Sequence, residues 1–224
     1  EEGRGIYSNI RQTLQYLLAC NTGELLLMTL CVLMGLPPPL LPIHLLWINL
    51  VTDGLPALCL ATDAIDPDVM KQRPRPRDEH IAANNFLGTM FLTGLLTAGV
   101  AFAVYFYSLQ TGSEELARTK AFTTLVFAEL LRAFGARSET KALWRIPLRT
   151  NLILAVVVFL VIGLQVWAHH NATLGLFLKT TFLSLEDCVL LLVISTIPLL
   201  ILELVKLWKN RRNELPLQQV DSLW

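Results

Sequence analysis

Polar side chains that can bind a metal ion recur inside long apolar stretches of this sequence. Asn21 and Glu24 are three residues apart in one such stretch, so a helix would place them on the same face. In the next stretch Asn49, Thr52 and Asp53 follow the spacing i, i+3 and i+4, which again defines one face. A carboxylate at the centre of a bilayer costs roughly 2.5–3.5 kcal/mol to insert. If these stretches cross a membrane, Glu24 and Asp53 are expected to be functional.

A further acid, Glu129, lies in the middle of a later apolar stretch, and Arg132 follows it three residues on. Two interpretations are open. Either Glu129 belongs to the same site as Glu24 and Asp53, or it forms an internal ion pair with Arg132, since residues three apart on a helix are neighbours. The amide and hydroxyl groups also have an alternative role, because such groups in membrane helices often hydrogen-bond to a neighbouring helix.

Oxygen is the donor atom that all of these side chains share. The candidate metal ligands are Asn21, Glu24, Asn49, Thr52, Asp53 and Glu129. Calcium takes about 6–8 oxygen ligands, whereas magnesium keeps several waters and is seldom enclosed by protein groups alone. The set contains no histidine or cysteine, which argues against zinc or copper. The four cysteines lie singly in apolar stretches, and we interpret them as small buried residues. The sequence therefore predicts a calcium site.

Six apolar segments have about the 20 residues that a helix needs to cross a bilayer. Their approximate bounds are 13–36, 40–62, 86–109, 119–136, 151–169 and 186–208. The chain is 54% hydrophobic and only 16% charged, whereas soluble domains are about 25% charged. The predicted fold is all-α, a polytopic membrane bundle of six transmembrane helices that forms a single domain over residues 1–224. The net charge of zero gives no argument for a nucleic-acid partner.

Proline and glycine indicate where the predicted helices are interrupted. Three consecutive prolines, residues 37–39, end the first span and leave a tight hairpin before the second. In the second span Gly54 and Pro56 follow Asp53, so we expect the helix to unwind between Asp53 and Pro56. Unwound backbone inside a membrane is tolerated where it lines a binding site.

Lysine and arginine are distributed unevenly between the two sides of the predicted bundle. Fourteen fall on the side that holds both termini and three on the other. Cytoplasmic loops carry the excess of basic residues, so both termini are predicted to be cytoplasmic. Three acids at the end of the second span, Asp63, Asp66 and Asp68, are interpreted as part of a solvated loop.

The segment LWINLVTDGLPA, residues 46–57, resembles the sixth membrane segment of P-type calcium pumps of the sarco/endoplasmic reticulum type. The sequence NTGE at residues 21–24 resembles their fifth segment, and EGRGIYSN at residues 2–9 resembles its cytoplasmic stalk. The proline- and arginine-rich residues 68–77 are similar to the loop after the sixth segment. The resemblance covers nearly the whole chain and is strongest over residues 1–80.

The resemblance implies that the chain corresponds to segments five to ten of a ten-segment pump. It assigns the first calcium site to Asn21, Glu24, Thr52, Asp53 and Glu129. Asn49 and Asp53 would contribute to the second site, which also needs a glutamate of the fourth segment. That segment is absent from this sequence. The family usually has an uncharged residue at the position of Arg132, so two ions per cycle do not follow from the resemblance.

The implied function is that of the cation-binding membrane part of an ATP-driven calcium pump, which moves Ca²⁺ out of the cytoplasm in exchange for protons. Its partners would be the remainder of the pump and membrane lipid. The remainder comprises four spans and the actuator, phosphorylation and nucleotide domains, which use Mg²⁺ and ATP. We identify no catalytic and no cofactor-binding residue in the chain, so on its own it is expected to be non-catalytic.

Two alternative functions remain: a P-type pump for Mn²⁺ or Na⁺, or a truncated ion-binding module without turnover. For the location of the protein, a bacterial plasma membrane is favoured over an organelle membrane.

Overall fold

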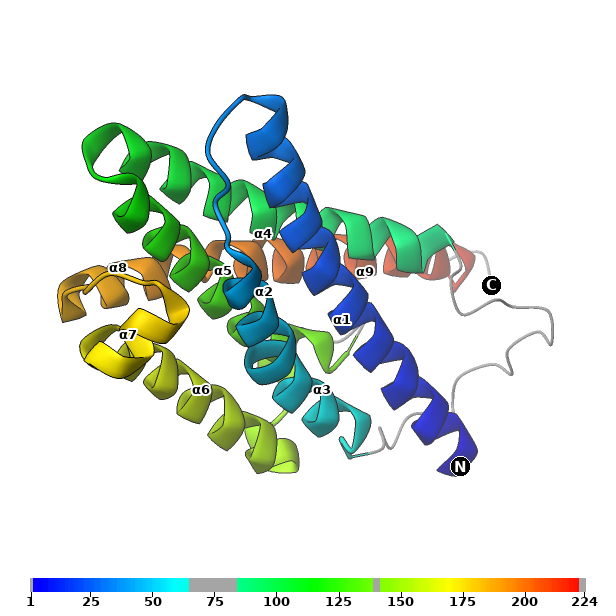
Figure 1. Cartoon of the computed structure of the whole chain (residues 1–224). Helices are drawn as coiled ribbons and strands as arrows, with labels where there is room; N and C mark the ends of the chain where they lie inside the picture. The colour runs from blue at the N-terminus through cyan, green and yellow to red at the C-terminus, as the bar shows by residue number, and fades with distance from the viewer. Residues whose placement is uncertain (1, 65–83, 139–141, 222–224) are drawn as a thin grey trace.

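A computed structural model describes residues 2–64, 84–138 and 142–221 of the chain (Figure 1). Within these ranges all regular secondary structure is helical and there is no strand, which confirms the predicted all-α fold. In chain order the elements are α1 (Glu2–Leu33), α2 (Pro42–Trp47), the π-helix η1 (Ile48–Asp53), α3 (Gly54–Ala61), α4 (Asn84–Thr111), α5 (Glu114–Ala136), the 3₁₀ turns η2 (Leu143–Arg145) and η3 (Leu148–Asn151), α6 (Leu152–His170), α7 (Ala172–Leu178), α8 (Leu185–Ile194) and α9 (Ile197–Asp221).

Five helical segments of the described chain are long and apolar enough to cross a membrane. They are Glu2–Leu33, Pro42–Ala61, Phe86–Thr111, Arg149–His170 and Leu185–Lys209. Each coincides with one of the six predicted spans. The remaining prediction, 119–136, is also helical, but charged residues such as Lys120, Glu129 and Arg132 make this helix less apolar. Nearly every residue of α5 between Ala117 and Ala133 is buried against other helices, so α5 has protein and not lipid around it.

The first hairpin forms where the prolines predict it. Gly35 has a φ of +67°, a conformation that favours glycine, and this lets the Leu36 N–H reach the Cys31 carbonyl at 2.9 Å. Residues 37–39 then lead to α2, and the second span returns along α1 with α3 in contact with it (Figure 1).

The second span does not unwind between Asp53 and Pro56, so that prediction was wrong in its form and place. The helix instead widens into the π-helix η1 over Ile48–Asp53, and α3 starts regularly at Gly54. The physical reason is Pro56, which has no N–H to donate and whose ring would crowd the carbonyl of Thr52 in a regular α-helix. The distortion is therefore taken up by the turn before the proline.

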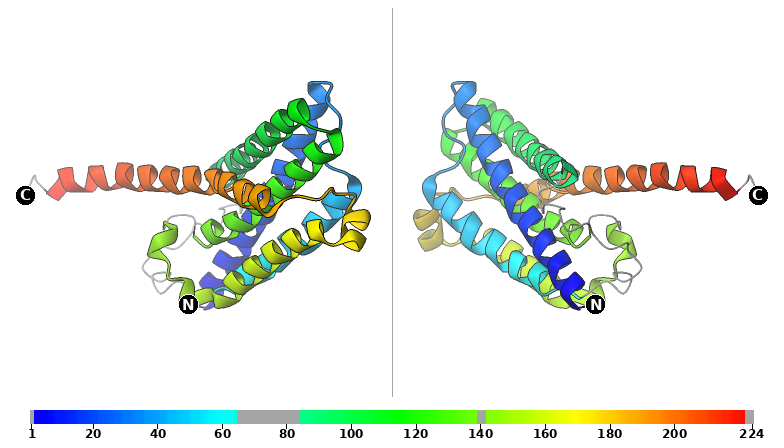
Figure 2. Two further views of the ribbon diagram at one scale, coloured as in Figure 1. Left: turned by 90° about the vertical axis from the view of Figure 1, so that its left-hand side faces the viewer. Right: turned by 90° about the vertical axis from the view of Figure 1, so that its right-hand side faces the viewer.

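A similar interruption divides the last span into α8 and α9. Pro198 lies in the first turn of α9, and its N–H would have bonded to the carbonyl of Ile194, which is where α8 ends. The Ser195 hydroxyl at the break donates to the Thr124 carbonyl at 3.0 Å. Figure 2 shows that α9 then leaves the bundle and continues outward far beyond the other helices.

Close contact between α1 and α4 depends on small residues. A Cβ atom at Gly94 would lie 2.8 Å from the Thr22 Cγ2 atom and 3.0 Å from the Gly23 backbone nitrogen. Helices in membranes commonly approach at such positions, since lipid gives little hydrophobic drive for association. Gly94 thereby allows α1 and α4 to approach closely.

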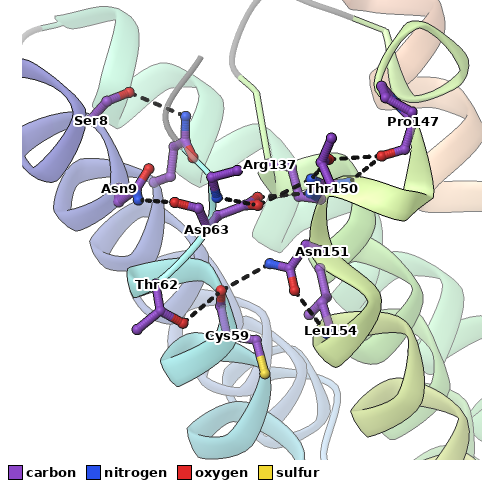
Figure 3. A network of polar contacts seen from close by, with 12 residues as sticks. Ser8, Asn9, Cys59, Thr62, Asp63, Arg137, Pro147, Thr150, Asn151 and Leu154 are labelled. Carbon is purple, nitrogen blue, oxygen red and sulfur yellow. Dashed lines mark hydrogen bonds and ion pairs between the residues drawn. The ribbon is translucent and has the colours of Figure 1, made fainter. Parts of the chain in front are cut away.

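A buried polar network joins the end of α3 to α1, α5 and η3 (Figure 3). Asp63 accepts two hydrogen bonds from Arg137, at 2.7 and 3.1 Å, and its backbone carbonyl accepts one from the Asn9 amide at 2.7 Å. Arg137 also donates to the Thr150 hydroxyl at 2.6 Å. Our interpretation of Asp63 as solvated was therefore wrong, because the arginine that neutralises it is distant in sequence. Asp66 and residues 68–77, which include Asp68, lie outside the described residues.

Candidate cation-binding site

Asp53 is the last residue of η1, and its carboxylate points into the interior of the bundle. It is 1% exposed, and η1 packs against α5. A carboxylate oxygen of Asp53, one of Glu129 and the Cys20 sulfur all lie within 4.8 Å of one another. Electrostatic interactions also link Glu24 to Asp53 and to Glu129. The three acids predicted from separate spans therefore face a common space.

Most side-chain oxygen atoms of this group are buried without hydrogen bonds. Across the described chain, the side-chain oxygens that lack a partner include Glu24 Oε1, Thr52 Oγ1 and both carboxylate oxygens of Asp53 and of Glu129. Thr52 and Glu129 are 0% exposed. Leaving a buried polar group unsatisfied costs about 1–3 kcal/mol, and more for a charged group. Such a cost at four adjacent residues fits a site whose oxygens are satisfied by a bound cation.

The π-helix explains why Thr52 and Asp53 point inward together. A π-helix closes its hydrogen bonds over five residues instead of four, and such turns are frequent at functional sites. The widened turn η1 ends at Asp53, and it buries Ile48, Thr52 and Asp53 while Asn49 stays exposed. The local sequence that produces this geometry is the pair Gly54 and Pro56 immediately after the site.

The two predicted amide ligands lie differently from the four buried residues. Asn21 is on an exposed part of α1, and Asn49 is exposed on η1, where its Nδ2 donates to the Leu45 carbonyl at 2.9 Å. The Asn49 side-chain oxygen remains available on that face. Their assignment as ligands stays a prediction, as does that of Glu24, Thr52, Asp53 and Glu129.

Arg132 does not form the internal ion pair with Glu129 that the sequence left open. Its Nη2 donates to the Cys20 sulfur at 2.7 Å and to the Tyr16 carbonyl at 3.1 Å, and the guanidinium lies 4.8 Å from the centre of the Tyr16 ring. Both Glu129 oxygens lack a hydrogen-bond partner among residues 2–64, 84–138 and 142–221. Arg132 thus connects α5 to α1 and leaves the Glu129 carboxylate available.

Sequence reasoning missed Cys20 as a member of this group. The residue is buried in the core, as we predicted for the cysteines, but its sulfur also lies close to the carboxylates of Asp53 and Glu129. The spacing contained the signal, since Cys20 is four residues before Glu24 and four after Tyr16, so all three share a helical face.

Comparisons with known proteins identify the family of the chain. The family model described as "Cation transporting ATPase, C-terminus" matches residues 37–208. The chain is 38% identical to the "Calcium-transporting ATPase 1" of Bacillus cereus, over 94% of the chain and 26% of that protein. It is 37% identical to the "Calcium-transporting ATPase" of Bacillus subtilis, over 90% of the chain and 23% of that protein.

A fungal relative matches to a similar extent. The "Endoplasmic reticulum calcium ATPase srcA" of Aspergillus fumigatus is 33% identical over 96% of the chain and 26% of its own length. The chain thus spans only about a quarter of the length of these relatives. Its apolar spans and the extent of the family match identify it as an integral, multi-pass membrane protein. The chain belongs to the cation-transporting ATPase C-terminal family.

Proposed function

We propose that this chain is the ion-binding membrane portion of an ATP-driven calcium pump that moves Ca²⁺ out of the cytoplasm. The observation that carries the proposal is the set of buried, unpartnered oxygens on Glu24, Thr52, Asp53 and Glu129. Calcium binds carboxylate, amide and hydroxyl oxygens at about 2.3–2.6 Å and tolerates irregular geometry. The calcium-transporting relatives support the same ion.

Asp53 is the residue on which this site depends most. It interacts electrostatically with Glu24 of α1 and Glu129 of α5, so it connects the two halves of the site. Asn21 and Asn49 supply amide oxygens from the exposed side of the chain. On that side the remaining spans of the pump complete the coordination, and their contribution decides whether a second ion is bound.

Transport requires that the site change its affinity for Ca²⁺ during the cycle. The energy comes from ATP and Mg²⁺ in the actuator, phosphorylation and nucleotide domains of the whole protein, and this chain supplies no catalytic residue. The N-terminal turns of α1, which run from Glu2 toward the site, transmit the movement. When Ca²⁺ leaves, the carboxylates take up protons, because unpaired charges buried in a bilayer are costly. The pump therefore counter-transports protons.

The orientation follows from the distribution of basic residues. Lysine and arginine concentrate on the side that holds both chain ends, with fourteen there against three on the other side. We assign that side to the cytoplasm. A bacterial plasma membrane suits the relatives from Bacillus.

The proposal is tested by calcium-dependent phosphorylation of the full-length protein with labelled ATP. Glu24→Gln keeps the volume of the side chain but removes a charged ligand, and we expect the Ca²⁺ concentration for half-maximal phosphorylation to rise by about 10-fold or more. The control is Glu115→Gln, which neutralises an exposed acid in the first turn of α5 and leaves that concentration unchanged.

Two outcomes contradict the proposal. Full calcium activation in Glu24→Gln means that Ca²⁺ is not the ion bound at this site, and Mn²⁺ or Na⁺ is then tested in the same assay. Absence of any phosphorylated intermediate in the wild-type protein means that it is an ion-binding module without turnover.

A further inference from the structure

Cys20, Asp53 and Glu129 bring one sulfur and two oxygen donors together from three different elements. Their ligand atoms lie within 4.8 Å of one another, and the residues are 1%, 1% and 0% exposed. Two ligands on opposite sides of an ion at about 2.3–2.6 Å are separated by about 4.6–5.2 Å. One ion can therefore contact all three atoms with small side-chain movements.

The Cys20 sulfur lies beside a buried cation, the guanidinium of Arg132. Arg132 Nη2 donates to this sulfur at 2.7 Å. The four carboxylate oxygens of Asp53 and Glu129 lack hydrogen-bond partners within the described parts of the chain. The two carboxylates are consequently free to turn toward an ion, and the Cys20 sulfur lies within 4.8 Å of them.

The other cysteines have no such surroundings. Cys31, Cys59 and Cys188 are also free and buried. Within the part of the chain that the structure describes, only Cys20 belongs to a group of three closely spaced metal-ligand side chains. The position of Cys20 is thus distinct from that of a buried thiol that only fills space.

We propose that Cys20, Asp53 and Glu129 form a mixed sulfur and oxygen site that binds soft or borderline divalent cations, such as Cd²⁺, in competition with Ca²⁺. On binding, the Cys20 S–H bond breaks, its proton passes to water, and a metal–sulfur bond forms. Thiolate ligands select softer metals, whereas Ca²⁺ gains little from sulfur. Only the competition with Ca²⁺ depends on the function proposed above; the binding of Cd²⁺ does not.

The test is a titration of the purified full-length protein with Cd²⁺ alone, followed by the charge-transfer absorption of the cadmium–thiolate bond. We expect the wild-type protein to show this absorption and excess Ca²⁺ to remove it. Cys20→Ser should abolish the absorption and weaken Cd²⁺ binding by about tenfold or more. The matched control, Cys31→Ser, changes a buried thiol three turns along the same helix. It should retain both the absorption and the affinity for Cd²⁺.

The outcomes separate this inference from the proposed function. If the wild-type protein binds radioactive Ca²⁺ but gives no cadmium–sulfur absorption, the mixed site is refuted and the calcium site stands. If the absorption appears but no Ca²⁺ binds, the mixed site stands and the calcium proposal fails. If Cys20→Ser retains the full absorption, the sulfur ligand is not Cys20 and the inference is overturned. The wild-type titration decides the first two outcomes even if Cys20→Ser does not fold.

Discussion

The ion pair between Arg137 and Asp63 provides a direct test of how the helix ends are held together. The two side chains are only 3% and 5% exposed and form two hydrogen bonds, at 2.7 and 3.1 Å (Figure 3). Replacing one partner of a buried pair leaves the other charge without compensation, which costs roughly 3–5 kcal/mol. Arg137→Met should therefore destabilise the protein by about this amount, because it leaves the buried Asp63 carboxylate, beside Asn9, without a positive partner.

The assay is thermal unfolding in detergent, followed by a fluorescent maleimide that reacts with cysteines as they become exposed. The free cysteines of the described chain are buried in the folded state, so the signal reports loss of helix packing. At roughly 2–4 °C per kcal/mol for a domain of this size, the loss corresponds to a fall of about 6–20 °C in the melting temperature. Adding Asp63→Leu to Arg137→Met should recover most of it, since an apolar pair is often as stable as a buried ion pair.

A partly exposed ion pair serves as the control. Lys120 and Asp187 interact at 3.0 Å with side chains that are 22% and 35% exposed. Such pairs contribute at most about 1 kcal/mol, so Lys120→Met should lower the melting temperature by only a few degrees. If Arg137→Met has as small an effect as Lys120→Met, the Asp63 carboxylate is solvated in the protein and the reasoning from burial is wrong.

Two further substitutions probe the packing and charge of the site. Gly94→Ala should destabilise the protein by about 1–3 kcal/mol, because the added methyl group overlaps Thr22 and the backbone of α1. The control is Gly163→Ala, which has open space around it and should leave the melting temperature unchanged in the same assay. Arg132→Met should strengthen Ca²⁺ binding by about tenfold in a titration with a calcium indicator, since it removes a positive charge that interacts with Asp53 and Glu129. Weaker binding in Arg132→Met would show that the contact with Cys20 is needed to shape the site.

Much of the fold was accessible from the sequence because membrane insertion constrains it strongly. Long apolar segments located the helices, and the prolines at residues 37–39 located the first hairpin correctly. The acids stood out because a charge in an apolar segment is costly, and Glu24, Asp53 and Glu129 do lie close enough to interact.

The remaining features depend on contacts between residues distant in sequence. Pro56 indicates a distortion, but only the structure shows its form, the widened turn η1 in place of an unwound segment. The burial of Asp63 could not be inferred without knowing that Arg137 lies opposite. Cys20 resembled any other apolar residue until α5 and η1 were placed beside it.

Equilibrium binding of radioactive Ca²⁺ to the full-length protein, wild type against Asp53→Asn, tests the central claim most directly. We expect the wild type to bind at least one Ca²⁺ ion per protein. Asp53 links the α1 and α5 sides of the site, so Asp53→Asn should abolish this binding. Unchanged stoichiometry and affinity in Asp53→Asn would contradict the assignment of these buried oxygens as the calcium site.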